Sequence, residues 1–365
     1  MKIAKSSRKM RKLPWVFGIL LLMSTHYVYC YLCNYFAISD DVIMYPLNVN
    51  LSDRYTKRSL YKTWMSSVYS INPANFSLIR APVSLCKPVL IQTISSENKT
   101  YLDILFVIKS RLHSFDQRRT IRNTWSNATC ALLAGARIQT VFALGTTPSP
   151  ALALETKLQE EHGRYNDLLQ FGFVDSYYNN TYKIMTALDY ISRTCQDTKF
   201  VIIVDDDFLV NLNNIIQKIS EVTTAEYSTY ISGLVFYTQQ PDRRPWSKWF
   251  VSYKEYPHRL FPPYPSGGTV VISMPVVRLL AAGMPFVKFF WIDDAYMGIV
   301  LYKYGIIPKL LPGVYLPRVA TESELPGMIS SHGFDSAAKM EQGWQRVVQT
   351  GACVGSNNER HRRNI

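Results

Sequence analysis

The sequence predicts a layered α/β domain built on a largely parallel central sheet, and three observations lead to this fold class. Short, mainly apolar runs such as 102–108 and 200–204 are typical of strands that are covered on both faces. Segments between them, such as 181–195, carry apolar residues in one stripe at helical spacing. The chain has 365 residues, 47% of them hydrophobic, which is enough for a sizeable core.

The expected elements follow one another between residues 102 and 305 and alternate in type, as in α/β proteins. Strands are expected at 102–108, 139–144, 200–204, 230–236 and 269–273. Helices are expected at 118–125, 151–162, 181–195, 212–219 and 293–304, the last closed by Gly305. In such sheets, ligands bind beyond the carboxyl ends of the strands.

The N-terminal part of the chain predicts a membrane anchor. Six basic residues and no acid precede residue 13, and 13–38 contains no Asp, Glu, Lys or Arg. A span of roughly 20 apolar residues crosses a bilayer, and basic flanks stay on the cytoplasmic side. A cleaved signal peptide has the same order of segments, but this apolar run is long for one. We expect a cytoplasmic tail at 1–12, a transmembrane signal-anchor at 13–35, a lumenal stem and lead-in at 36–100, and a folded domain at 101–365.

Sequons and cysteines agree with passage through the secretory pathway. Five N-x-S/T sequons follow the anchor, at Asn50, Asn75, Asn98, Asn127 and Asn179. Four of the six cysteines would be lumenal, which allows two disulfides whose pairing the sequence leaves open: Cys86, Cys130, Cys195 and Cys353. The net charge is +13, yet we find no basic stripe with interleaved aromatic residues, so no nucleic-acid partner is expected.

Three adjacent carboxylates, Asp205, Asp206 and Asp207, directly follow the apolar run 200–204. Carboxylates so close together repel one another, and hard divalent cations such as Mg²⁺ or Mn²⁺ take oxygen ligands. Asp205 and Asp207 point to the same side of an extended segment, so together they could bind one metal that also binds a diphosphate. The alternative is a solvated turn that caps the helix at 212–219.

Seven segments, in order, resemble motifs of the β1,3-galactosyltransferase family, glycosyltransferase family 31. They are RRTIRNTW at 118–125, FALG at 142–145, EHGRYNDLLQFGFVDSYYNNTYK at 161–183, FVIIVDDDFLVN at 200–211, KWFVSYKEYP at 248–257, FPPYPSGGTVVIS at 261–273 and IDDAYMG at 292–298. The departures from the family pattern are Gly172 for Asp, Asn180 for Leu, Pro265 for Cys, Thr269 and Val270 for a Gly-Tyr pair, and Asp293 for Glu.

The resemblance implies a GT-A type nucleotide-sugar transferase fold, with 101–365 as the catalytic domain. It further implies an inverting β1,3-galactosyltransferase that uses UDP-galactose and Mn²⁺ and acts on a glycolipid or glycoprotein acceptor. Its expected place is the Golgi membrane, as a single-pass type II protein. Transfer of N-acetylglucosamine or N-acetylgalactosamine is the alternative of the same class. An inactive, transferase-like lumenal chaperone or lectin is the alternative of another class.

The resemblance also suggests roles for individual residues. Asp294 is the candidate base, with Asp293 beside it, and Asp205 and Asp207 are the candidate metal ligands. His332 is a weaker candidate for the metal. The candidate nucleotide-binding residues are Arg118, Arg122, Asp175, Lys183, Asp205 and Asp206. Aromatic residues that could stack on sugars are Trp249, Tyr256, Tyr264 and Trp291, and the backbone at Ser266, Gly267 and Gly268 could approach a ligand closely.

Overall fold

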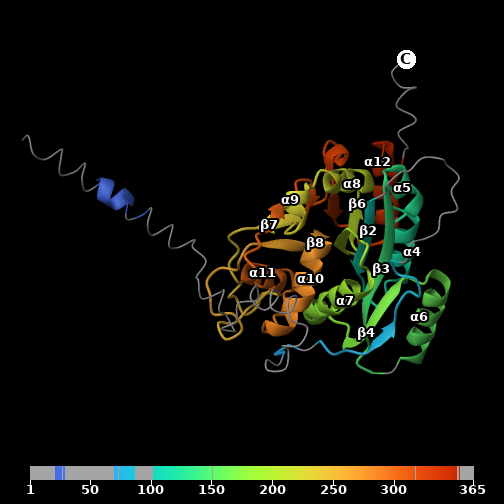
Figure 1. The fold of residues 1–365 in the computed structure, drawn as a ribbon, viewed down its shortest axis with the longest axis horizontal. Coiled ribbons are helices and arrows are strands. Elements are labelled where there is room, and N and C mark those ends of the chain that lie inside the picture. The colour runs from blue at the N-terminus through green and yellow to red at the C-terminus, as the bar shows by residue number, and fades with distance from the viewer. Residues whose placement is uncertain are drawn as a thin grey trace, which may run out of the picture.

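Two sheets form the framework of the protein in the computed structural model (Figure 1). The structure describes residues 21–26, 28, 70–72, 74–86, 102–149, 151–316, 318–351 and 353. The large sheet has the spatial order β1 (Leu78–Arg80), β4 (Leu168–Val174), β3 (Ala136–Thr146), β2 (Leu102–Lys109), β5 (Phe200–Asp205), β8 (Tyr264–Ser273), β7 (Ile231–Phe236) and β9 (Lys309–Leu310). The small sheet has the order β10 (Val314–Tyr315), β11 (Ser330–His332) and β6 (Phe208–Val210).

The large sheet is mixed, which corrects the expectation of a largely parallel one. Strands β4, β3, β2 and β5 are parallel, but β8 runs antiparallel to both β5 and β7, and β1 runs antiparallel to β4. The runs at 200–204 and 269–273 pair directly, with Val204 opposite Thr269. An apolar run that is covered on both faces carries no signal of strand direction, so the sequence could not distinguish the two arrangements.

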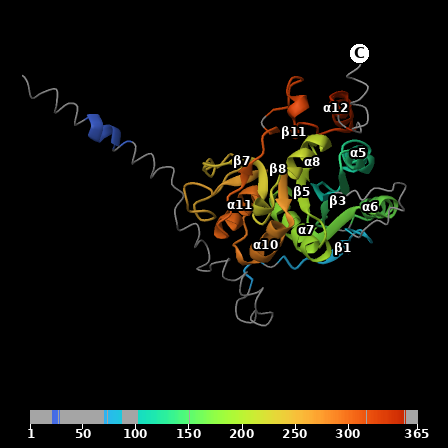
Figure 2. The same ribbon diagram turned by 45° about the horizontal axis from the view of Figure 1, so that its top comes forward.

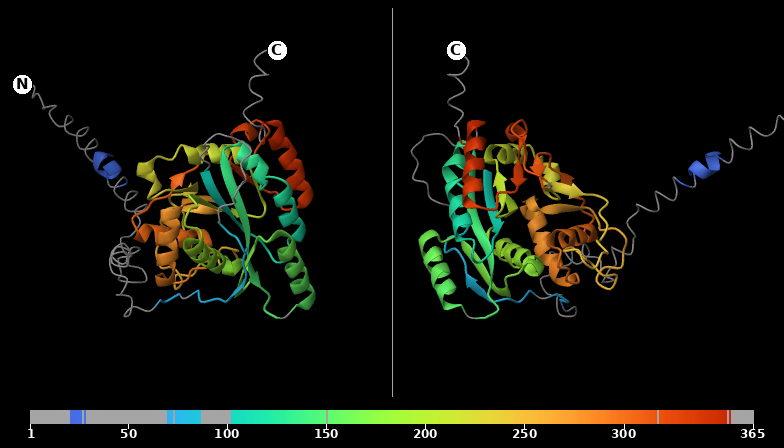
Figure 3. Two further views of the ribbon diagram at one scale, coloured as in Figure 1. Left: turned by 45° about the vertical axis from the view of Figure 1, so that its right-hand side comes forward. Right: turned by 180° about the vertical axis from the view of Figure 1, so that it is seen from behind.

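Helices cover both faces of the large sheet, because successive strand residues point to opposite sides. One face packs against α4 (Phe115–Asn123), α5 (Ala128–Leu133), α6 (Leu152–Tyr165), α8 (Leu212–Ser220) and α12 (Ala337–Gln349) (Figure 2). The other face packs against α7 (Asn180–Thr194), α10 (Met274–Gly283) and α11 (Asp293–Lys303) (Figure 3). Short helices at α9 (Thr224–Tyr227), η1 (Tyr177–Asn179), η2 (Met284–Phe286) and η3 (Leu325–Gly327) complete the described elements.

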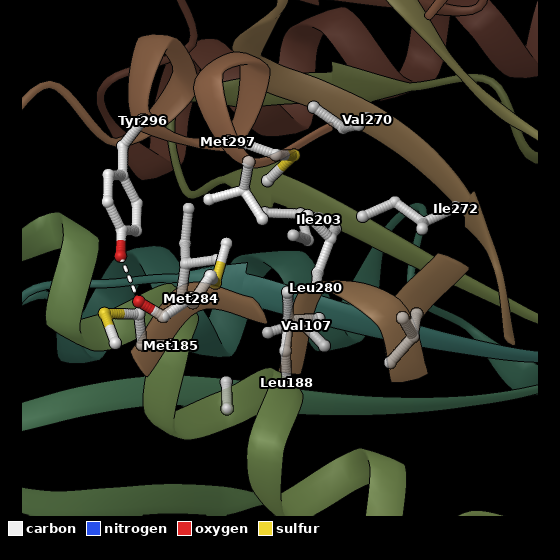
Figure 4. Close-up of a cluster of buried hydrophobic side chains, with 14 of the residues drawn as sticks. Val107, Met185, Leu188, Ile203, Val270, Ile272, Leu280, Met284, Tyr296 and Met297 are labelled. Atoms are coloured by element: carbon white, nitrogen blue, oxygen red, sulfur yellow. Dashed lines mark hydrogen bonds between the residues drawn. The ribbon is translucent and has the colours of Figure 1, made fainter. Parts of the chain in front are cut away.

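The core under α7, α10 and α11 joins strands to helices from distant parts of the chain. Val107, Ile203 and Ile272 come from three neighbouring strands and meet Leu188 and Leu280 from the helices (Figure 4). Side chains of this size contribute about 1.5–3 kcal/mol each when they are fully buried. This core therefore fixes α11, whose first residues belong to the candidate site, against the sheet.

The described part of the lead-in packs on the domain. β1 adds to the edge of β4, the Asn72 amide donates to the Tyr296 hydroxyl at 3.1 Å, and Cys86 is joined to Cys195. The folded unit thus begins before residue 101. Contact with this segment also explains why a glycine stands at position 172. A Cβ on Gly172 would lie 2.6 Å from the Ser77 hydroxyl oxygen.

Both pairs of the predicted lumenal cysteines form disulfides. Cys86–Cys195 ties the lead-in to the end of α7, and Cys130–Cys353 ties α5 to the segment after α12. The Cα atoms are 5.1 and 4.5 Å apart. The expectation of two disulfides is confirmed, and the structure supplies the pairing that the sequence left open.

Several N-terminal predictions fall largely outside the described residues. These are the tail at 1–12, most of the anchor at 13–35, and the sequons at Asn50 and Asn98. Residues 21–26 are helical, and in the part of the chain that the structure describes, no helix is both long and apolar enough to span a membrane. Asn75 is exposed, Asn127 caps α5 by accepting from the Thr129 amide, and the Asn179 side chain donates to the Val174 carbonyl. Glycosylation at these positions stays a prediction.

Candidate active site

An acidic cluster lies where β2 and β5 end and α11 begins. Lys109, the last residue of β2, stands opposite Asp205, the last residue of β5. The Lys109 ammonium lies 2.9 Å from an Asp205 carboxylate oxygen and 2.8 Å from one of Asp293. This lysine therefore joins the acidic triplet to the acidic start of α11.

Lys109 was not among the residues singled out from the sequence. Its side chain is only 5% exposed. Burial opposes its charge, but Asp205 and Asp293 outweigh that effect and raise the pKa of Lys109 above its ordinary value. The only signal in the sequence was a basic residue directly after the apolar run at 102–108, the strand that pairs with the strand before the triplet.

We expect Lys109→Met to destabilise the domain, because it removes the buried cation that the half-buried carboxylates of Asp205 and Asp293 share. Breaking a buried ion pair from one side costs about 3–5 kcal/mol. The measurement is chemical denaturation of the purified chain. Lys309→Met is the matched control, since Lys309 pairs with Glu226 at an exposed position, and it should leave the denaturation midpoint unchanged. Equal midpoints for the two variants would contradict a stabilising role for Lys109.

The three carboxylates of the triplet have different partners. Asp205 faces Lys109, whereas Asp206 accepts a hydrogen bond from the Ser110 hydroxyl at 2.8 Å. Asp207 lies 3.2 Å from Nε2 of His332, which β11 positions by pairing with β6. Burial raises the pKa of Asp205 to about 6, although Lys109 opposes the shift. The structure therefore brings His332, the weaker candidate, directly to Asp207.

Asp293 and Asp294 begin α11, next to the glycine-rich start of β8. The Asp294 carboxylate accepts hydrogen bonds from the backbone amides of Ala295 at 2.7 Å and Gly267 at 3.3 Å. A Cβ at Gly267 would lie 3.0 Å from the Lys109 nitrogen, so glycine allows the close approach here. Burial, and then the charge of Asp293, raise the pKa of Asp294 to about 7, with Lys109 opposing. Asp294 is thus a half-buried carboxylate poised to exchange a proton near neutral pH.

Arg118 and Arg122 are held mainly by acidic residues of α6 and of the segment before β4, and Arg118 also donates to the Ser110 hydroxyl at 3.2 Å; their role as nucleotide-binding residues stays a prediction. The fully buried Arg118 guanidinium donates to both Glu161 oxygens and to the Arg111 carbonyl. Arg122 pairs with Glu161 and Asp167. These contacts tie α4 to α6 and to the start of β4. The acids belong to the same predicted motif block, but their pairing with the arginines depends on tertiary packing that spacing cannot show.

Lys183 and Asp175 form a buried ion pair beneath the loop that follows β2. Their charged atoms are 2.9 Å apart, and Lys183 also donates to the Ser110 carbonyl at 2.7 Å. Asp175 accepts from the Gly145 amide at the end of β3. The pair therefore supports Ser110, which in turn holds Asp206 through its hydroxyl. A nucleotide-binding role for Lys183, Asp175 and Asp206 stays a prediction.

The four aromatic candidates separate into two groups. Tyr256 and Tyr264 are buried in the core, so the suggestion that they stack on sugars is corrected. Trp249 is exposed and Trp291 is half-buried, so these two stay candidates for stacking on a sugar. A separate cavity of about 350 Å³ opens at the carboxyl end of β3, between the loop that follows this strand and α6.

The arrangement defines an α/β protein with a half-buried acidic centre around the buried Lys109, at the carboxyl edge of its sheet. The family model described as galactosyltransferase matches residues 116–312, and the chain belongs to this galactosyltransferase family. It is accordingly a glycosyltransferase by family.

Individual relatives carry more specific names. The human lactosylceramide 1,3-N-acetyl-β-D-glucosaminyltransferase is 34% identical over 209 residues, which cover 56% of this chain and 55% of that protein. A β-1,3-galactosyltransferase of Drosophila melanogaster is 30% identical over 66% of this chain and 73% of its own length. The match thus spans about half of the human relative. A solved bifunctional glycosyltransferase, WbbM, gives a TM-score of 0.35 at 11% identity, covering 72% of this chain and 51% of that one, a likeness too slight to bear on the fold.

Proposed function

We propose that this chain is an inverting β1,3-galactosyltransferase with a GT-A type fold. It would transfer galactose from UDP-galactose to a sugar on a glycolipid or glycoprotein. Family membership and relatives named for β-1,3 transfer support the class of reaction. The observation that carries the mechanism is the half-buried Asp294 carboxylate beside Asp293, whose raised pKa of about 7 suits a general base.

In the proposed reaction, Asp294 removes the proton of the acceptor hydroxyl as that oxygen attacks the anomeric carbon of the donor sugar. The bond from this carbon to the UDP oxygen breaks, and the configuration at the carbon inverts. The nearby Asp293 is held by the Lys109 ammonium at 2.8 Å. This ion pair leaves Asp294 as the carboxylate of the two that is available for proton transfer.

A divalent cation fits the donor set near the triplet. Within the described ranges, no three histidine, cysteine or acidic side chains are gathered as ligands of one metal ion. However, Asp207 and His332 face each other, and Asp205 lies two residues before Asp207, at the end of β5. Oxygen and imidazole ligands suit Mn²⁺, which can complete its shell with phosphate oxygens. We propose that these three residues hold Mn²⁺, whose charge would stabilise the departing diphosphate.

The pH dependence of transfer should show the ionisation of Asp294. The base works only when deprotonated, so kcat should rise with pH along a limb centred near pH 7, in accord with its pKa of about 7. Asp293→Asn removes a neighbouring negative charge, which should lower the pKa of Asp294 and move this limb to lower pH. The measurement is the pH–rate profile of both proteins. A limb that stays in place in the variant would contradict electrostatic coupling of the two acids.

The deciding experiment is a survey of UDP-sugars with the purified chain and Mn²⁺, with and without EDTA. Turnover of UDP-galactose alone supports the proposal. Turnover of UDP-N-acetylglucosamine would favour the second candidate, which rests on the 34% identity to the human N-acetylglucosaminyltransferase. UDP-N-acetylgalactosamine completes the survey. Absence of UDP binding would instead favour a non-catalytic chaperone or lectin.

We also propose that the protein is a single-pass type II protein of the Golgi membrane. The two disulfides support an oxidising compartment for the domain. The apolar stretch at 13–35 and the basic tail support the anchor and its orientation. Protease protection of the domain in sealed vesicles, together with a mobility shift on enzymatic deglycosylation, tests this topology.

A further inference from the structure

One glutamine side chain links the two segments that carry the proposed metal ligands. Gln117, on α4, donates from its Nε2 nitrogen to the Asp206 carbonyl at 2.7 Å and to the Phe334 carbonyl at 2.6 Å. Asp206 directly precedes Asp207, and Phe334 lies two residues after His332. We propose that Gln117 is a positioning residue that holds Asp207 and His332 at the separation needed to bind one divalent cation. This inference rests on the proposed function, because it concerns the metal proposed for that reaction.

The surroundings determine which end of the Gln117 amide faces the two carbonyls. An amide nitrogen carries two N–H donors, one for each carbonyl oxygen, whereas the amide oxygen can only accept. Turning the amide over would place its oxygen against two carbonyl oxygens. The side chain is buried, and among the described residues its Oε1 oxygen has no hydrogen-bond partner. The two N–H contacts are therefore what holds this amide in place, and both go to the segments of the metal ligands.

Helix α4 gives this side chain a rigid base. The residue after Gln117 is the fully buried Arg118, whose guanidinium donates to Glu161 on α6. One turn further along α4, Arg122 pairs with Glu161 and with Asp167, just before β4. These ion pairs fix α4 to the body of the domain. The Gln117 amide is therefore held at a defined place beside the acidic triplet.

The two linked segments also meet through their own backbones. The Phe334 amide donates to the Asp207 carbonyl at 3.0 Å, and β11, which ends at His332, pairs with β6. The Phe334 ring is buried in the core and packs against α12. The Gln117 amide closes a small cycle of contacts, from the Asp206 carbonyl to the Phe334 carbonyl and back through the Phe334 amide to Asp207. The turn of the triplet and the end of β11 are thus held together as one unit.

The two metal ligands themselves lie on short elements. Asp207 is in the turn between β5 and β6, and His332 is the last residue of the three-residue strand β11. The Asp207 carboxylate is 3.2 Å from Nε2 of His332. Ligands whose positions are set before the ion arrives lose little conformational freedom on binding, which raises the affinity. Gln117 connects the backbone on both sides of this contact to a helix, so it fixes the separation of the two ligands.

The test is Mn²⁺ titration of the purified full-length chain in the presence of UDP, with free Mn²⁺ measured by electron paramagnetic resonance. Gln117→Met keeps the length of the side chain but removes both donors. We expect it to weaken Mn²⁺ binding on the order of tenfold, as when hydrogen bonds around metal ligands are lost. The Mn²⁺ concentration for half-maximal transfer should rise by the same factor, while the rate at saturating Mn²⁺ stays close to that of the wild type. A merely structural role would lower the thermal unfolding temperature without changing the Mn²⁺ dependence.

Gln117→Asn is a milder second variant. It keeps the amide but is one methylene shorter, so it cannot reach both carbonyls, and it should also weaken Mn²⁺ binding. Gln217→Met is the matched control, because Gln217 is an exposed glutamine on α8, and it should bind Mn²⁺ as the wild type does.

The outcomes separate this inference from the proposed function. Wild-type Mn²⁺ affinity in the folded Gln117 variants would overturn the inference and leave the proposed function standing. Failure of both variants to fold would make Gln117 a determinant of stability and overturn its separate role at the metal. A wild-type chain that binds UDP but no Mn²⁺ would overturn the inference together with the proposed metal site. A wild-type chain that binds neither would overturn the proposed function as well.

Discussion

Replacing Asp294 by Asn is expected to lower kcat for sugar transfer on the order of a thousandfold, the usual contribution of a positioned general base. The amide has nearly the same shape as the carboxylate and still offers an oxygen to the backbone amides of Gly267 or Ala295. It cannot accept the proton of the acceptor hydroxyl. The UDP affinity should therefore change little, and the loss should appear in kcat. The measurement is initial-rate kinetics together with UDP titration.

Asp189→Asn is the control for Asp294→Asn. Asp189 is an exposed acid on α7 that pairs with Arg193, so its replacement should leave transfer and UDP binding unchanged. Thermal unfolding should show that both variants remain folded. Asp294→Asn with more than a tenth of wild-type kcat would remove this residue from the role of base. Asp293 would then become the candidate base.

Removing the facing pair Asp207 and His332 should have an effect of similar size through a different step. We expect Asp207→Asn combined with His332→Ala to abolish the increase in UDP affinity that Mn²⁺ provides, and to reduce transfer on the order of a thousandfold. The reason is that a metal held by Asp205 alone has lost two of its three protein ligands. The measurement is calorimetric titration of UDP with Mn²⁺ and with EDTA.

Asp335→Asn is a suitable control for the pair, because Asp335 lies three residues from His332 but forms an exposed ion pair with Lys339. Its UDP affinity should respond to Mn²⁺ as in the wild type. A double variant that still gains UDP affinity from Mn²⁺ would show that the metal, if bound, uses other ligands. Such a result would leave the base role of Asp294 untouched.

The sequence predicted those elements in which apolar residues recur at the spacing typical of a buried strand or helix. β2, β5 and α8 were found because nearly every inward position is apolar. β4 was missed because its sequence contains Gln170 and Gly172, which look out of place in a buried strand. Gln170 is nevertheless buried, since its amide donates to the Gly145 carbonyl and accepts from Arg80.

The acidic residues of the candidate site could be predicted from the sequence, but the residues that pair with them could not. The triplet and the Asp293–Asp294 pair are adjacent in sequence, so their clusters are visible directly. Lys109 stands far from both along the chain and meets them only through the register of β2 against β5. The pairing of Arg118 with Glu161 could not be read from the sequence either, because tertiary packing brings α4 and α6 together. Ion-pair partners that are brought together by strand register or by helix packing cannot be predicted from the spacing of nearby residues.

The strand that the lead-in adds to the sheet also determines how the protein can be shortened. A chain that began at residue 101 would expose the backbone edge of β4, which β1 covers. Free strand edges recruit other strands and promote aggregation. The same truncation would leave Cys195 without Cys86, so a thiol would become available for intermolecular disulfides. Insolubility of such a fragment would therefore reflect the missing strand and cysteine rather than any instability of the catalytic centre.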